Sequence, residues 1–216
     1  GSDQVRQRLV SFWTNHFTMG GFESRELSSH AMEEGILGSF NDSFASMLYK
    51  ATTHPAMLMY LDNHISAGPN SQHVRWARSR NEQAGLNDNL GRELLELHTV
   101  SPDVNYTETD IRNAAKVLAG WGMDVQGNSP QNLLEQAGTI NHWDMYKKNW
   151  AEPGSKLVLG KTIYQGKQGL KQLTDFLATH DHTINHLSFK LAEHFVRDDP
   201  QQTDIDYISN AWRQGN

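Results

Sequence analysis

The stretch that decides the fold is residues 89–98, Asn89-Leu90-Gly91-Arg92-Glu93-Leu94-Leu95-Glu96-Leu97-His98. At about 100° per residue, Leu86, Leu90, Leu94 and Leu97 form one stripe of a helix. The polar residues Asn89, Arg92, Glu93 and Glu96 form the adjacent stripe. We therefore predict a helix over residues 87–100 that buries its leucines and turns its polar stripe toward other protein rather than bulk water.

The same helical period recurs along most of the chain. It predicts further helices over residues 3–17, 28–36, 42–52, 55–61, 107–121, 169–179, 183–197 and 204–212. Thr107 followed by Asp110 is a variant of the capping box that starts a helix. We expect a mainly α fold, an irregular array of helices that forms one domain over residues 1–216. Gly1-Ser2 is interpreted as the remnant of a cleaved tag.

Two segments break the helical pattern. Residues 66–83 are polar and contain Gly68-Pro69-Asn70, which predicts a long loop. Residues 124–164 are rich in Gly, Asn and aromatic residues and are interpreted as a small insertion. Within it, residues 145–147 and 156–159 flank the turn signal Pro153-Gly154, so we expect a small β-hairpin around residues 143–160.

Composition excludes several classes of protein. The net charge is −6 and the pI is about 6.0. Because proteins that bind nucleic acid need a basic surface, these values argue against a nucleic-acid-binding protein. Because no run of 18 apolar residues occurs, we expect no membrane-spanning helix. The chain has no cysteine, which excludes disulfides and thiolate ligands, so a metal site would need its 11 histidines or its carboxylates.

The polar stripe allows two interpretations. Glu93 and Glu96 on one helix face could serve as an acid/base pair or as metal ligands. A salt-bridge network gives the same pattern, and the fixed charge of Arg92 favours that network and argues against a metal ion. His16, one turn after Trp13 on an apolar face, is a core histidine or a ligand. His182 and His186 have the spacing of a metal pair without an evident third ligand, so surface histidines are the favoured interpretation.

Several strings, in chain order, resemble the bacterial family known as domain of unknown function 1800. They are Phe12-Trp13-Thr14-Asn15-His16-Phe17, residues 54–63 from His54-Pro55 to Asp62-Asn63, residues 85–99 from Gly85 to Thr99, Tyr106-Thr107 with Asp110, Gly120-Trp121, Lys156 with Leu159-Gly160, and Lys190-Leu191 with His194-Phe195-Val196. The resemblance implies an internal piece of a longer bacterial protein. It also implies export to the periplasm or cell envelope, and it brings no established reaction, substrate or cofactor.

The resemblance adds polar residues to the candidate site. They are His16, Asp62, Asn63, Asn89, His98 and His194. In an enzyme interpretation, which would be hydrolytic, Glu93 and Glu96 supply carboxylates, His16 or His98 acts as base or ligand, and Arg92 holds an anionic group. Asp62, Asn63, Asn89, His98 and His194 are then candidates for ligand binding.

Two other interpretations stay open beside the enzyme. In one, the chain is a non-catalytic scaffold or a protein-binding module whose polar stripe is a buried structural network. In the other, Trp143 and Trp150 bind a glycan by stacking. The chain also departs from the resembling family, which has His-Asp where Ala151-Glu152 stand and small or apolar residues where His182 and His186 stand.

Overall fold

The computed structural model describes residues 2–18, 42–122 and 146–215, and in this part the chain is mainly α, which confirms the expected fold class. The elements are α1 (Ser2–His16), α3 (Phe44–Thr53), α4 (Pro55–Tyr60), the short 3-10 helix η3 (Asn63–Ile65), α5 (Gln72–Ser79), α6 (Asn89–Glu96), α7 (Glu108–Leu118), β1 (Lys156–Val158), β2 (Lys161–Ile163), α9 (Lys167–Ala178), α10 (Asp181–Phe195) and α11 (Gln202–Gly215). The helix expected over residues 28–36 and the side chain of Trp143 lie outside the described residues.

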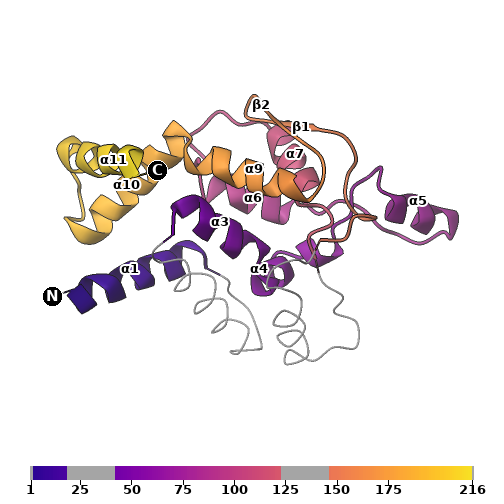
Figure 1. The fold of residues 1–216 in the computed structure, drawn as a ribbon, viewed down its shortest axis with the longest axis horizontal. Coiled ribbons are helices and arrows are strands. Elements are labelled where there is room, and N and C mark those ends of the chain that lie inside the picture. The colour runs from indigo at the N-terminus through magenta and orange to yellow at the C-terminus, as the bar shows by residue number, and fades with distance from the viewer. Residues whose placement is uncertain (1, 19–41, 123–145, 216) are drawn as a thin grey trace.

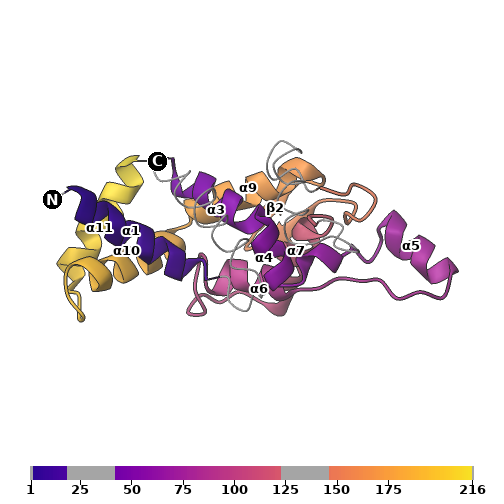
Figure 2. The ribbon, with the colours of Figure 1, turned by 90° about the horizontal axis from the view of Figure 1, so that it is seen from below.

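The helices are arranged along one long axis (Figure 1). Helices α1, α10 and α11 lie together at one end, and α5 projects at the other, and the view from below agrees (Figure 2). Helices α3, α4, α6, α7 and α9 form the middle. One cluster of buried apolar side chains runs from α1 through this middle part to α10.

The centre of that core is the pair α6 and α7. Leu90, Leu94 and Leu95 of α6 and Ile111 and Leu118 of α7 are fully buried. Burial of a leucine or isoleucine side chain stabilises the fold by roughly 1.5–3 kcal/mol. Gly91 allows the close approach of the two helices, because a Cβ at this position would lie 2.7 Å from the backbone nitrogen of Ala115.

Local signals explain where the helices begin. The side chain of Thr107 accepts a hydrogen bond from the backbone N–H of Asp110, and the Asp110 carboxylate accepts one from the backbone N–H of Thr107. The predicted capping box of α7 is therefore confirmed. At α4, the His54 side chain caps the helix and Pro55 occupies its first turn, where no N–H partner is needed.

Helix α6 is shorter than the predicted 87–100, because it ends at Glu96. The backbone N–H groups of Leu97 and His98, four and five residues on, both donate to the Glu93 carbonyl at 3.0 Å, which closes the end of the helix. As a result Leu97 is exposed, against its predicted place in the leucine stripe, and His98 is buried.

The small hairpin is confirmed, but its strands differ from the predicted pair. β1 falls within the expected 156–159, while its antiparallel partner is β2, which follows it in the chain. Leu159 and Gly160 both have positive φ, at 48° and 76°, as a tight two-residue hairpin turn requires. Tyr146 instead forms an isolated antiparallel bridge with Trp121.

The prediction of a long loop over residues 66–83 was wrong for the middle of that segment, because α5 forms there. Ser71 caps this helix, its hydroxyl accepting from the Val74 N–H at 3.1 Å. Val74 and Ala77 are its two buried residues, too few apolar positions for the helical period to be recognised in the sequence.

Candidate functional site

The polar stripe of α6 is half-buried. Arg92, Glu93 and Glu96 are all partly covered, in line with the expected contact with protein, while Asn89 is exposed. The side chains of Arg92 and Glu96 keep 37% and 26% of their accessible surface. The stripe therefore lies at the margin of the core.

Arg92 and Glu96 belong to one network with the start of α7. The Arg92 guanidinium donates to Glu108 at 2.9 and 3.2 Å and to Glu96 at 3.3 Å. The Tyr106 hydroxyl donates to the same Glu96 oxygen at 2.6 Å. Burial and this bond to Glu96 raise the pKa of Tyr106 to about 12. The bond from Arg92 lowers the pKa of Glu108. Protein groups thus already satisfy Arg92 and Glu96.

Glu93 differs from its neighbours. In the described part of the chain its carboxylate accepts no hydrogen bond and forms no ion pair. Burial, and then the nearby charge of Glu96, raise the pKa of Glu93. It is the member of the stripe that remains available for acid chemistry.

His16 meets His98 and Lys190 rather than the carboxylates. The His16 Nε2 atom lies 3.1 Å from the His98 carbonyl oxygen, so it must carry the proton and donate. The His16 Nδ1 atom is then the acceptor for the Lys190 ammonium at 3.0 Å. Among the described contacts none joins His16 to Arg92, Glu93 or Glu96, so the combined site suggested by the sequence has no contact to support it.

His16 and His98 are both held neutral by their surroundings. Burial, and then the charge of Lys190, lower the pKa of each, that of His98 to about 4. The His98 ring packs 5.2 Å from that of Phe17 between centroids, and its Nδ1 atom has no hydrogen-bond partner among the described residues. This cluster ties α1 to α10 and to the turn after α6.

Among the described hydrogen bonds, none joins the remaining predicted residues, Asp62, Asn63 and His194, to the polar stripe of α6. Asn63 is buried, and its Nδ2 donates to the carbonyls of Leu118 and Trp121 at 3.1 and 2.7 Å, which clamps η3 to the end of α7. Asp62 is exposed, with a positive φ of 55°. His194 is half-buried against the ring of Phe12 at 5.5 Å.

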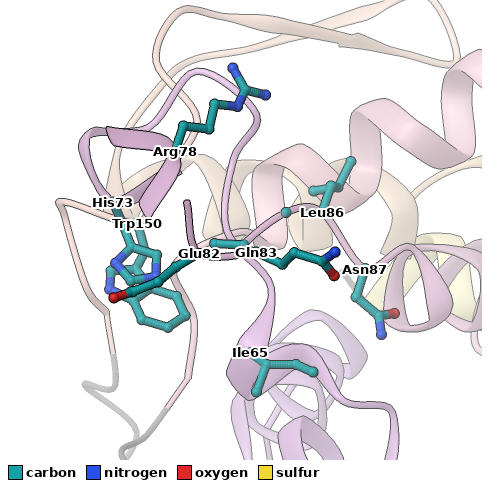
Figure 3. Close-up of a pocket in the computed structure, with 10 residues that line it drawn as sticks. Ile65, His73, Arg78, Glu82, Gln83, Leu86, Asn87 and Trp150 are labelled. Carbon is teal, nitrogen blue, oxygen red and sulfur yellow. The ribbon is translucent and has the colours of Figure 1, made fainter. Parts of the chain in front are cut away.

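An open cleft that the sequence did not reveal lies beside α5 (Figure 3). Its volume is about 830 Å³. Its lining residues come from η3, α5, the segment that returns from α5 to α6, and the loop before β1: Ile65, His73, Arg78, Glu82, Gln83, Ala84, Gly85, Leu86, Asn87 and Trp150. Six of these, residues 82–87, are consecutive, so one wall of the cleft is a single stretch of chain.

Stacked rings hold α5 and the loop before β1 together at one end of this cleft. The ring of His73 stacks on that of Trp150 with their centroids 3.8 Å apart, and the ring of Trp76 lies 6.0 Å from that of His73. Figure 3 shows His73 and Trp150 side by side at this end of the cleft. Lys147 and Arg80 place their cations over Trp150 and Trp76 at 4.5 and 4.9 Å. Trp150 is thus engaged by protein groups, which counts against the predicted stacking of a glycan on it.

Glu152, at the position where the sequence departs from the resembling family, is buried. Its carboxylate accepts from the backbone N–H and the side-chain amide of Asn70 at 2.8 and 2.7 Å. Gly68 is required here, because a Cβ on it would lie 2.5 Å from the Glu152 Cα. This pair fixes the loop before β1 against the start of α5.

Within residues 2–18, 42–122 and 146–215, no three histidine or carboxylate side chains are grouped so that they could hold a metal ion. His182 is exposed and its ring stacks near that of His180 at 5.6 Å. Across the same ranges, no helix has the length and apolar character needed to cross a bilayer.

These features define a mainly α protein whose recognisable polar string on α6 is tied into the fold. The chain belongs to the family described as "Protein of unknown function (DUF1800)", which it matches over residues 1–216. No curated protein and no solved structure matches it. The family therefore agrees with the sequence resemblance and assigns no activity.

Proposed function

We propose that the chain is a non-catalytic binding module that takes a partner protein in the cleft between α5 and residues 82–87. The observation that carries this proposal is the cleft itself, which is open, about 830 Å³ in volume and lined by both polar and apolar groups. Binding pockets in proteins commonly have a volume of roughly 300–1,000 Å³.

The state of the α6 stripe supports the same proposal. Arg92 donates hydrogen bonds to Glu96 and Glu108, and Glu96 also accepts one from Tyr106. These bonds within the protein give both residues a structural role. Because these residues hold α6 against the start of α7, their presence is explained without a substrate. The stripe then serves as the scaffold on which the cleft is built.

The competing function is hydrolytic and would rest on Glu93. A half-buried carboxyl group with a raised pKa is suited to donate a proton. However, His16 makes its polar contacts elsewhere, and no lining residue of the α5 cleft belongs to α6. The binding function accounts for more of the observed contacts.

The test is a selection of random 12-residue peptides displayed on phage against the immobilised chain. A matched pair of variants locates the binding site: Ile65→Glu within the cleft and Leu157→Glu on β1. These residues are 56% and 55% exposed, so both variants should fold. We expect enriched peptides to bind the wild type and the Leu157→Glu variant and to lose binding to the Ile65→Glu variant. Failure to enrich any peptide, or equal binding to both variants, would refute the function.

A further inference from the structure

We infer that a second hollow, between residues 70–75 and the loop before β1, binds a small phosphate monoester through Arg75 and Lys148. We call it the Arg75 hollow. It shares no lining residue with the α5 cleft, and the inference does not depend on the protein partner proposed for that cleft. It combines three observations: a hollow of ligand size, two cations without carboxylate partners, and a lining rich in hydrogen-bond donors.

The backbone brings the two cations to the same place. The His73 N–H donates to the Asn149 carbonyl at 2.9 Å, which joins α5 to the loop beside it (Figure 1). Arg75 lies two residues after His73, and Lys148 lies one residue before Asn149. Both cations line the Arg75 hollow, which has a volume of about 650 Å³.

Neither cation is neutralised by the protein. In the part of the chain that the structure describes, no carboxylate forms an ion pair with Arg75 or Lys148. The Arg75 guanidinium is held in place by one hydrogen bond, from Nη1 to the Asn70 carbonyl at 2.9 Å, which leaves its other N–H groups for a ligand. The Lys148 ammonium adds its own donors, because it bonds to none of the described residues.

The acceptors of this lining are largely occupied. Glu152 is the one carboxylate among the described lining residues, and both of its oxygens accept from Asn70, at 2.8 and 2.7 Å. The Gln165 Oε1 accepts from the Gly154 N–H at 2.7 Å, so the amide NH₂ of Gln165 is left for a ligand. Burial raises the pKa of Tyr146, which keeps its hydroxyl protonated as a further donor. Positive charge and spare donors together select an anion.

The number of charges favours phosphate over carboxylate. A phosphate monoester carries about −1.5 to −2 charge at pH 7 and three acceptor oxygens, so it can meet both cations at once. Arginine binds such a group through two parallel hydrogen bonds, and lysine binds it as a point charge. Because the volume of the Arg75 hollow lies within the range of small-molecule pockets, it also has room for the organic group that carries the phosphate.

The experiment compares three ligands with one carbon skeleton: glycerol 3-phosphate, glycerate and glycerol. Their binding to the full chain is followed through the NMR shifts of the backbone amides of residues 70–76 and 146–154. We expect glycerol 3-phosphate to bind at least about tenfold tighter than glycerate, and glycerol not to bind. Equal affinity for phosphate and carboxylate would overturn the ligand class. No shift at about 10 mM glycerol 3-phosphate, tenfold above a Kd of roughly 1 mM, would overturn the site.

Matched variants separate this site from general attraction between an anion and surface cations. Arg75→Gln and Lys148→Gln each remove one charge from the Arg75 hollow, while Arg112→Gln removes one from α7. All three residues are exposed, so the variants should fold, which circular dichroism checks. Each of the first two should weaken glycerol 3-phosphate about tenfold, and Arg112→Gln should leave its affinity within about twofold. Equal weakening by all three variants, or unchanged affinity in the first two, would refute the assignment.

Discussion

The buried imidazole of His98 should make the stability of the fold depend on pH in a defined window. His98 is 3% exposed, and burial together with the charge of Lys190 lowers its pKa to about 4, against 6.5 for an unperturbed histidine. Because the unfolded chain binds this proton more readily, stability is complete above pH 6.5 and falls as the pH drops toward 4. At about 1.4 kcal/mol per pKa unit, the loss amounts to roughly 3 kcal/mol.

Other groups with shifted pKa values also change the stability of the fold with pH. The lowered pKa of His16 adds to the loss in the same direction. The raised pKa of Glu93 opposes it, since the folded state then holds its proton more readily. The lowered pKa values of Asp110 and Asp181 act mainly at lower pH. The lowered pKa values of His73, His180 and His186, each caused first by burial, add to the loss in the same direction, so a His98 variant is needed to isolate the contribution of His98.

The assay is urea unfolding followed by circular dichroism at pH 7 and at pH 4.5, for the wild type and two matched variants. His98→Leu removes the buried imidazole, and His182→Leu removes an exposed one. The wild type and His182→Leu should lose about 2–3 kcal/mol more than His98→Leu between the two pH values. If His98→Leu loses as much stability as the wild type, the reasoning on His98 is refuted.

Three substitutions test the packing around α6 and α7 by the same unfolding measurement. Asn63→Ala leaves the carbonyls of Leu118 and Trp121 without their buried donor and should cost about 2–4 kcal/mol, so a loss below 1 kcal/mol would contradict the clamp. Gly91→Ala should cost about 1–3 kcal/mol, although alanine favours helices, because its Cβ meets the Ala115 backbone; a stabilised variant would show that the helices can separate. Tyr106→Phe should cost about 1 kcal/mol through the lost bond to Glu96 and leave peptide binding unchanged, whereas lost binding would tie the stripe to the site.

Sequence periodicity predicted the elements whose signals are local. The leucine period placed α6, and Thr107 with Asp110 placed the start of α7, because a capping box involves only residues three apart. Helix α5 was missed since it buries only Val74 and Ala77. The hairpin partner was misplaced because Leu159-Gly160, which turns with positive φ, is a weaker turn signal than Pro153-Gly154.

The candidate site was harder to predict because its contacts join distant parts of the chain. Spacing on α6 indicated that Arg92 and Glu96 can pair, and they do. Their other partners, Glu108 at the start of α7 and Tyr106 just before it, lie outside α6. The partner of His16, Lys190, is 174 residues away. The α5 cleft depends on the stacking of His73 on Trp150, and no local pattern of the sequence links those two residues.

The most direct test of the central claim, that the partner binds at the α5 cleft and not at the α6 stripe, is hydrogen–deuterium exchange with and without a peptide enriched on the wild-type chain. The account predicts slowed exchange in residues 82–88, which contain one wall of the cleft, and unchanged exchange in α6. Protection of residues 89–96 from exchange, with none in residues 82–88, would contradict the account. The polar stripe of α6 would then be the binding site.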